Sequence, residues 1–385
     1  MDYAATTPTD KLVLKAMNPF FSEKFGNPSS IHFEGVAANK AVLEARTKIA
    51  RELQAHPDEV VFTSGGTEAN NLAIFGAVKA VEKLGKAVSK MHFITTKIEH
   101  SSVLECFREL EARGAKVDYA PVKSDGVIDP KTIVGLVRKD TVLVSVQYAN
   151  NEIGTIQPLR EIGKQLESFS QKTNLKRPLF HTDASQAPLY LRLTAENLQI
   201  NLMTLDGHKM YGPKGIGMLY IKRGTDIQPI ILGGGQERGM RSTTESVPMI
   251  VGLAEALALA GNRREKDSMR LKKLRDYFFA EALANKKISD KIIINGSLTE
   301  RLPNNVNISV SELDAEFAVL KFDAFGIACS TKSSCLGTEG GSYVVKACGG
   351  GEERSDSTLR FTFGHETQKK DVDYLLKCLE KIIAS

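Results

Sequence analysis

The residues with the clearest chemical potential lie in the run DGHKMYGPKG, residues 206–215. Lys209 follows His208 directly and stands just before a tyrosine, glycines and a proline, after the apolar stretch LMTL. A tight turn at the end of a strand can hold a lysine so that its amine meets an aldehyde instead of solvent. A surface lysine in a hairpin is the alternative for this decapeptide alone, so the other segments of the chain decide between the two.

Other apolar stretches also end in polar residues. Alternation with helical segments predicts strands over residues 59–64, 92–97, 141–148, 179–183, 202–205 and 215–221. Polar residues stand at or just after the ends of the first five: Gly65-Gly66-Thr67-Glu68, then Glu99-His100, then Asn150-Asn151-Glu152, then Asp183 with Gln186, and then Lys209. Strands that are apolar on both faces and joined by helices predict an α/β fold with a mostly parallel sheet. Its strand ends meet at one crevice, which favours a shared site.

The side-chain types at these strand ends match the needs of pyridoxal 5'-phosphate (PLP). Lys209 can bind the aldehyde, and the carboxylate of Asp183 can keep the pyridine nitrogen protonated. Gln186 and Asn151 can hydrogen-bond the ring oxygen, and the imidazole of His100 can stack on the ring and move protons. Each of these roles is an expectation about geometry.

The segment GGTEANN predicts a phosphate-binding position. Gly65 and Gly66 allow a sharp turn, and Thr67 and Glu68 begin a helix whose free N–H groups favour an anion. A glycine turn before a helix is ordinary structure more often than a binding site, so this signal is weak by itself.

Bulk composition narrows the class of protein. The chain has 385 residues, of which 42% are hydrophobic and 25% charged, with a net charge of +5 that is spread along its length. We expect a soluble, cytoplasmic protein of two domains, with no nucleic-acid partner, no membrane span and no export signal. The large domain is predicted over residues 15–255, and the small α+β domain over residues 1–14 and 256–385. Five cysteines without a C-x-x-C pair argue against a disulfide framework or a metal site.

Over nearly its whole length, the chain resembles the cysteine desulfurases, fold-type I PLP enzymes related to the class V aminotransferases. The motifs that carry the resemblance are DYAATTP, FGNPSSIH, TSGGTEANN, EHSSVLE, NNEIGTIQP, HTDASQA, DGHKMYGPKGIG, GGGQERGMRSTTESVP, SSC followed by SYVV, and LRFTFG. This resemblance implies the PLP-transferase fold type I.

The resemblance also implies a role for each site residue. Lys209 would hold PLP, Asp183 would pair with the pyridinium, His100 would stack on the ring, Gln186 and Asn151 would contact its oxygen, and Gly66, Thr67 and His208 would bind the phosphate. Arg360 in STLRFTFG would bind the substrate carboxylate, which suits its planar guanidinium. In a homodimer, Thr244 would reach the phosphate of the partner subunit.

Two thiols are candidates for the nucleophile. Counting back from SYVV, the active cysteine of the family falls on Cys335 in the polar segment KSSCLGTEGG, which is predicted to be an accessible loop. Cys329 ends the apolar segment AFGIAC and is predicted to be a small core residue. Lys332, expected to be exposed on the loop, would stabilise the thiolate form of Cys335.

The activity implied by the resemblance is conversion of L-cysteine to L-alanine, with a persulfide formed on Cys335. That sulfur would pass to an acceptor, such as an iron-sulfur scaffold protein or the machinery of tRNA thiolation. Selenocysteine lyase or a related aminotransferase is the alternative within the fold, and a catalytically silent scaffold protein is the alternative of another class.

The chain departs from the family pattern at Asp206. The family usually has a serine or threonine three residues before the lysine, and a carboxylate at that position would repel a phosphate. We expect either that Asp206 turns away or that the phosphate contacts are rebuilt, with Thr204 as a possible substitute on the same side of the strand.

Overall fold

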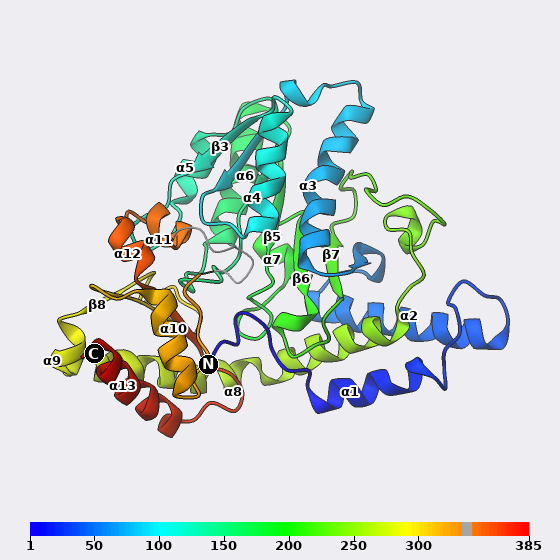
Figure 1. Ribbon diagram of the computed structural model, residues 1–385. Coiled ribbons are helices and arrows are strands. Elements are labelled where there is room, and N and C mark those ends of the chain that lie inside the picture. Colours follow the sequence, from blue (N-terminus) through cyan, green and yellow to red (C-terminus); the bar gives the residue numbers. More distant parts are fainter. Residues whose placement is uncertain (333–340, 385) are drawn as a thin grey trace.

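The computed structural model describes residues 1–332 and 341–384, and within them the largest unit is a seven-stranded sheet of order β1-β7-β6-β5-β4-β2-β3 (Figure 1). Its strands are β1 (Val60–Thr63), β2 (His92–Thr96), β3 (Lys116–Ala120), β4 (Thr141–Ser145), β5 (Leu179–Asp183), β6 (Leu202–Asp206) and β7 (Gly217–Ile221). Strands β3, β2, β4, β5 and β6 pair in parallel, whereas β7 pairs antiparallel with both β6 and β1. The predicted mostly parallel sheet is confirmed, and β3 is the strand that the prediction missed.

Helices cover both faces of this sheet. They are α1 (Lys11–Met17), α2 (Phe33–Leu53), α3 (Gly66–Lys83), α4 (Ser101–Ala112), α5 (Pro130–Gly135), α6 (Leu159–Thr173), α7 (Ala195–Leu198) and α8 (Val247–Ala284). Val61 of β1 packs in a core with α3 and α4, while its neighbour Phe62 packs in a second core with α2, α6 and α8. Because successive side chains of a strand point to opposite faces, an apolar strand such as β1 fills both cores.

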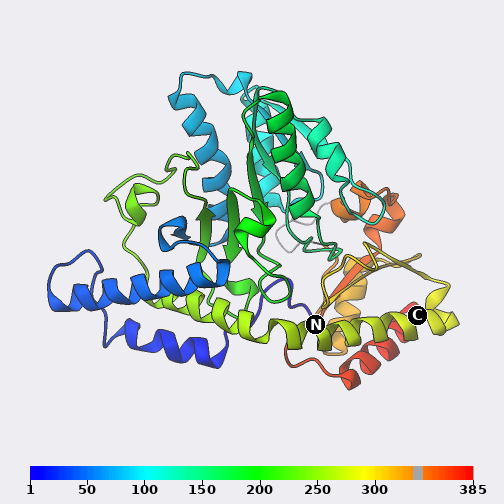
Figure 2. The same ribbon diagram turned by 180° about the vertical axis from the view of Figure 1, so that it is seen from behind.

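A second, three-stranded antiparallel sheet lies in the C-terminal part of the chain. It consists of β8 (Ile292–Ile294), β9 (Asn305–Val310) and β10 (Thr358–Thr362), in the order β10-β9-β8. The helices of this part are α9 (Lys286–Ser289), α10 (Ala315–Ala324), α11 (Tyr343–Ala347), α12 (Glu352–Asp356) and α13 (Lys369–Ile383). The long helix α8 runs along the base of the molecule from α1 and α2 to α9 and α13 (Figure 2).

The N-terminal residues connect the two sheets. Asp2 forms a parallel bridge with Thr362 at the end of β10, and the amide of Thr362 donates to the carbonyl oxygen of Met1 at 2.8 Å. Ala4 N donates to Thr362 Oγ1 at 2.9 Å, and the next residues lead into α1 beneath the large sheet. The start of the chain thereby reaches the ends of β5 and β6.

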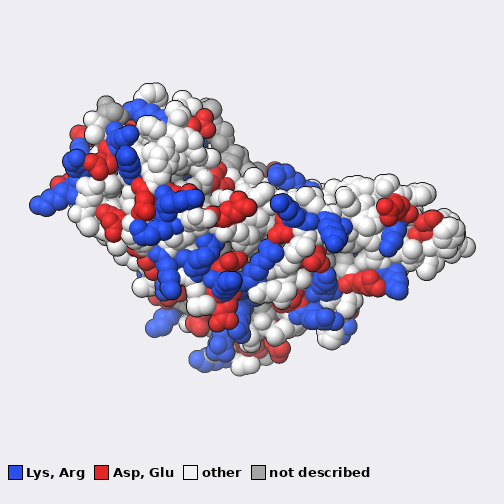
Figure 3. All heavy atoms as spheres, turned by 90° about the horizontal axis from the view of Figure 1, so that it is seen from below, with Lys and Arg blue, Asp and Glu red and all other residues white. Residues whose placement is uncertain are grey.

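The surface carries both signs of charge. In the view from below, lysine and arginine side chains are interspersed with aspartate and glutamate, in keeping with the net charge of +5 (Figure 3). Among the described residues, no helix has both the length and the apolar character that a membrane span needs.

Candidate active site

A cleft lies at the carboxyl ends of the parallel strands, where the sheet topology predicts a ligand site. It is lined by Ala4, Ala5, Gly66, Thr67, His100, Ser102, Gln147, Ala149, Asn151, Asp183, Ser185, Gln186, Asp206, His208, Lys209 and Arg360. The space between these residues, counted together with the open solvent at the mouth of the cleft, is about 720 Å³. We call His100, Asp183 and Lys209 the lysine end of the cleft, and Gly66, Thr67, Asp206 and His208 its helix end.

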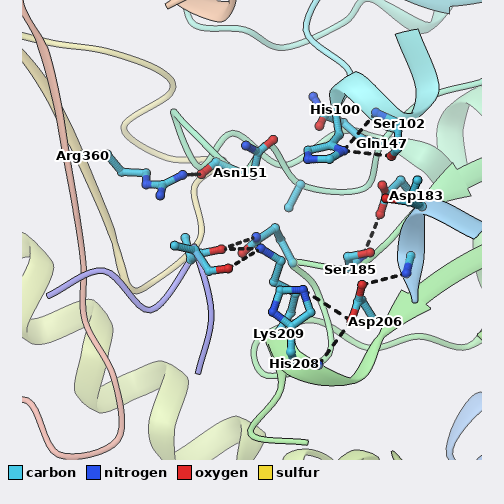
Figure 4. Close-up of a pocket in the computed structure, with 16 residues that line it drawn as sticks. His100, Ser102, Gln147, Asn151, Asp183, Ser185, Asp206, His208, Lys209 and Arg360 are labelled. Atoms are coloured by element: carbon cyan, nitrogen blue, oxygen red, sulfur yellow. Dashed lines mark hydrogen bonds and ion pairs between the residues drawn. The ribbon is translucent and has the colours of Figure 1, made fainter. Parts of the chain in front are cut away.

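Lys209 lies in the short 3-10 turn that follows β6, and its side chain enters the cleft (Figure 4). Its Nζ donates to the carbonyl oxygens of Ala4 and Ala5, both at 2.8 Å. The turn is closed by the amide of Gly212, which donates to Gly207 O at 3.0 Å. A Cβ on Gly212 would lie 2.7 Å from that oxygen, so a glycine is needed there. The turn and the N-terminal segment together position the amine.

Asp183 ends β5 with its carboxylate toward the cleft. One oxygen accepts from Asn70 Nδ2 at 2.8 Å, and the other accepts from Ser185 N at 2.9 Å. Asn70 belongs to α3 and also donates to Ser102 Oγ at 2.8 Å. These contacts fix the orientation of the carboxylate. It can therefore accept a hydrogen bond from a protonated ring nitrogen in the cleft.

His100 is the N-cap residue of α4 and approaches the cleft from the side opposite Lys209 (Figure 4). Its Nδ1 lies 2.8 Å from Ser102 Oγ and accepts from Ser102 N at 3.2 Å. Accepting the amide proton leaves Nδ1 unprotonated, which places a ring proton on Nε2. The preceding Glu99 is fully buried, and this burial raises its pKa to about 8, although hydrogen bonds from Gln147 N and Thr96 Oγ1 lower it.

Arg360 reaches the cleft from β10 and is only 2% exposed. Its Nη1 donates to Asn151 O at 2.8 Å, and its Nη2 lies 2.9 Å from Asp2 Oδ1. Ser330 Oγ in turn donates to the other Asp2 oxygen at 2.7 Å. Since both terminal nitrogens are held, the guanidinium plane is fixed before any ligand binds.

Gln186 and Asn151 are the two residues predicted to contact the ring oxygen, and both are in the lining of the cleft. Gln186 lines the cleft, and its Nε2 donates to Ala4 O at 3.0 Å, so it supports the same N-terminal segment that holds Lys209. Asn151 also lines the cleft. Among the residues that the structure describes, Asn151 Oδ1 and Arg360 Nε are buried without a hydrogen-bond partner, so a polar ligand has an acceptor and a donor to use.

At the helix end, Asp206 does not turn away from the cleft. Gly66 is the first residue of α3, and its N–H donates to Asp206 Oδ2 at 2.7 Å. His208 N donates to Asp206 Oδ1 at 3.3 Å, and His208 Nδ1 lies 3.1 Å from Thr6 Oγ1. Of the two alternatives expected for Asp206, the first, that it turns away, is wrong, because the first N–H of α3 attracts a carboxylate as it attracts any anion.

Thr204 does not take over a phosphate contact. It is fully buried in β6, and its Oγ1 lies 3.2 Å from His181 Nε2 inside the core. The alternation of the strand does put Thr204 and Asp206 on one face, but Asp206 reaches the strand end whereas Thr204 is covered. The helix end therefore offers Gly66, Thr67 and His208 alongside a carboxylate.

The remaining predicted residues lie outside the cleft or outside the described part of the chain. Thr244 is exposed and does not line the cleft. Cys329 is buried, as predicted, and burial raises its pKa to about 12, so its thiol stays protonated near pH 7. Cys335 lies outside the described residues. Lys332 is buried, not exposed as expected, and its Nζ is 3.8 Å from Glu316 Oε1.

Sequence reasoning missed several residues that shape the cleft. Asp2 and the carbonyl groups of Ala4 and Ala5 hold Arg360 and Lys209 across more than 200 positions of sequence. No local pattern marks such contacts, although DYAATTP was among the motifs quoted for the resemblance. Asn70 and Ser102 hydrogen-bond Asp183 and His100. The sequence feature that could have pointed to them is their place in the motifs TSGGTEANN and EHSSVLE.

The cleft fits PLP at its lysine end. An amine, a carboxylate fixed by two donors and an imidazole lie around one space, which is the set of groups that the aldehyde and the pyridine ring need. The buried Asn151 Oδ1 and Arg360 Nε offer contacts to a polar ligand. At the helix end the first N–H of α3 is already bonded to Asp206, so the fit to a phosphate is poorer there.

Comparison with known proteins places the chain in a family. The sequence profile described as Aminotransferase class-V matches residues 1–375, and the chain belongs to this family. The protein is 44% identical to "Cysteine desulfurase IscS" of Dictyoglomus turgidum (strain DSM 6724 / Z-1310), over 100% of this chain and 94% of the relative.

Two solved structures resemble the whole fold. One described as "NIFS-LIKE PROTEIN" superimposes with a TM-score of 0.90 at 35% identity, covering 100% of this chain and 98% of the other. Another, "SspA in complex with cysteine", gives a TM-score of 0.78 at 34% identity, covering 94% of this chain and 97% of the other. The expected PLP-transferase fold type I is confirmed by these matches.

Proposed function

We propose that this protein is a cysteine desulfurase that converts L-cysteine to L-alanine and leaves the sulfur as a persulfide on Cys335. The observation that carries the proposal is the full-length identity of 44% to a curated cysteine desulfurase. The cleft supports it, because Lys209, Asp183 and Arg360 supply an amine, a carboxylate and a guanidinium around one space.

PLP is the cofactor that this cleft would hold. Its electron-poor ring, when bound, withdraws electrons from the α-carbon of an amino acid. Lys209 would hold the aldehyde, Asp183 the ring nitrogen, and Gly66, Thr67 and His208 the phosphate.

Each side chain of the cleft has a task that follows from its contacts. Arg360, held by Asn151 O and Asp2, would bind the carboxylate of L-cysteine through its guanidinium group. The side chain of Asn151 would bind beside it. His100 would carry a proton at Nε2, because Ser102 N donates to Nδ1. Gln186 would keep Ala4 in place beneath the amine of Lys209.

Cys335 would accept the sulfur. The four described cysteines, Cys106, Cys329, Cys348 and Cys378, are all buried, and burial raises the pKa of the first three thiols to about 12, about 12 and about 11. A thiol with such a pKa carries very little thiolate near pH 7 and is a poor nucleophile. This comparison leaves Cys335 as the nucleophile we propose.

The test is to supply L-cysteine and a reductant and to measure sulfide and L-alanine together. Equal yields of the two products are expected. Sulfide without alanine would mean a different elimination chemistry, and a protein that takes up no PLP would support a scaffold role instead.

We also propose a homodimer. Large apolar side chains are exposed on α1, α2 and the segment between them: Leu12 (49%), Leu14 (47%), Phe21 (56%), Phe25 (70%), Ile31 (98%), Phe33 (80%), Val36 (57%) and Leu43 (54%). These elements lie together at one end of the molecule, where a second copy would cover them (Figure 2). In the dimer Thr244 would reach the partner's phosphate position. A monomeric mass in analytical ultracentrifugation would contradict this part of the proposal.

The proposal extends to the sulfur acceptor, the cellular location and the division into domains. The name of the relative favours iron-sulfur cluster assembly, with a scaffold protein as acceptor, and tRNA thiolation remains the other route. We propose a cytoplasmic protein with a large PLP-binding domain over residues 15–255 and a small domain formed by residues 1–14 and 256–385. The separate apolar core around β9 and β10 supports such a division.

A further inference from the structure

The carboxylate of Asp206 occupies the place where an anion would bind α3. Its Oδ2 accepts from the N–H of Gly66 at 2.7 Å, and its Oδ1 accepts from His208 N at 3.3 Å (Figure 4). A Cβ built on Gly66 would lie 3.1 Å from Asp206 Oδ2 and 3.2 Å from Ser185 Oγ. The carboxylate is therefore packed closely against the backbone at the start of the helix.

The start of α3 is otherwise suited to an anion. The helix extends from Gly66 to Lys83, which is long enough to have a developed dipole, and its N-cap Gly65 provides no side-chain hydrogen bond. The first N–H groups therefore depend on a partner from elsewhere. Asp206 is that partner for Gly66, and it comes from β6 across 140 positions of sequence.

The imidazole of His208 compensates the charge of Asp206 only weakly. His208 Nε2 lies 3.5 Å from Asp206 Oδ1, but burial lowers the pKa of His208, despite the opposing effect of Asp206. An imidazole whose pKa lies below its usual value of 6.5 is mostly neutral at pH 7. A dianionic phosphate placed at the same N–H groups would meet the carboxylate at short range.

We propose that Asp206 determines cofactor specificity by competing with the 5'-phosphate for the start of α3. This inference rests on the proposed function, because it assumes that the cleft binds PLP. The phosphate then adds less to the affinity for the cofactor than an open helix start would allow. In return, Asp206 caps α3 when no cofactor is bound, which stabilises the empty protein.

The experiment compares two ligands that differ only in the phosphate. The full-length chain, purified and dialysed free of cofactor, is titrated by calorimetry with PLP and with pyridoxal. The variant Asp206→Asn keeps the shape of the side chain and its ability to accept from Gly66, but removes the charge. Asp129→Asn is the matched control, since Asp129 caps α5 by accepting from Lys131 N at 3.0 Å and does not line the cleft.

In Asp206→Asn we expect PLP to bind at least about tenfold more tightly, or about 1.4 kcal/mol, while pyridoxal binding changes less than about twofold. Asp129→Asn should change neither affinity. Inorganic phosphate should raise the thermal midpoint of Asp206→Asn more than that of the wild type. Asp206→Ser serves as a second variant if the first does not fold, with the same expected direction.

Two results would overturn the inference in distinguishable ways. If Asp206→Asn changed PLP and pyridoxal binding equally, or weakened PLP alone, the cofactor site would stand but the competition by Asp206 would be wrong. If neither ligand bound to any variant or to the wild type, the proposed function itself would fail, and this inference with it.

Discussion

At the lysine end of the cleft, Lys209 and Asp183 contact neutral amide, carbonyl and side-chain dipoles, whereas at the helix end Asp206 places a negative charge on an N–H group of α3. The first arrangement orients charged groups and leaves them available to a ligand. In the second arrangement, the carboxylate of Asp206 fills the position at the start of α3 where another anion could bind. The same sheet edge therefore provides one end that is ready for PLP and another where the ligand must compete.

The largest effect is expected at the lysine end, from Lys209→Ala. Without the amine, the aldehyde of the cofactor has no covalent partner, so conversion of L-cysteine should fall by about 10³-fold or more. Alanine production at saturating PLP measures this. Lys214→Ala is the control, because Lys214 is exposed five residues further along the chain and does not line the cleft. Equal losses in both variants would contradict the special role of Lys209.

The two candidate thiols should differ almost as much. Cys335→Ser should lower sulfide release by roughly 10²-fold or more, because a hydroxyl cannot accept sulfur as a persulfide. Cys329→Ser should keep turnover within about threefold, since that thiol is buried and stays protonated. Trapping of the protein persulfide by mass spectrometry gives the direct measurement. A persulfide on Cys329 in the wild type would reverse the assignment.

Arg360→Lys tests the fixed guanidinium with a smaller effect. Lysine keeps the charge but cannot contact Asn151 O, Asp2 and a substrate carboxylate together, so KM for L-cysteine should rise by roughly 10- to 100-fold with a smaller change in kcat. Steady-state kinetics separate the two constants. Arg108→Lys, at an exposed position of α4, should change neither constant. An unchanged KM in Arg360→Lys would place the carboxylate elsewhere.

Glu99→Gln should have the smallest effect on turnover, because its effect is on the pH dependence of stability. The unfolded chain ionises Glu99 above about pH 4.5, while burial keeps the folded carboxyl protonated up to a pKa of about 8. The wild type should therefore lose stability relative to Glu99→Gln as pH rises between these values, reaching a difference of roughly 5 kcal/mol. Urea unfolding from pH 4 to pH 9 measures it, with exposed Glu105→Gln as control. A pH-independent difference would mean that Glu99 is ionised in the fold.

Much of the cleft was predictable because it depends on local patterns. Six apolar runs predicted strands, and all six are present in the sheet. Parallel strands present their carboxyl ends at one edge, so placing Asp183 and Lys209 in one cleft required no knowledge of side-chain contacts. Strand β3 was missed because KVDYA is half-exposed at the sheet edge and lacks the apolar run of a central strand.

The features that could not be predicted are long-range or depend on competition between groups. The contact of Asp2 with Arg360 spans 358 positions of sequence. Lys332 is buried, although its polar sequence neighbours predicted an exposed position. For Asp206, sequence reasoning weighed repulsion from a phosphate but not attraction to the N–H of Gly66. In the structure the attraction decides where the carboxylate lies.

Borohydride reduction of the PLP-loaded protein tests the central claim most directly, because it makes the bond between a lysine and the cofactor permanent. Peptide mapping by mass spectrometry should then find the reduced cofactor on the peptide that contains Lys209. Finding it on the Lys214 side chain instead, or on no lysine at all, would contradict the account.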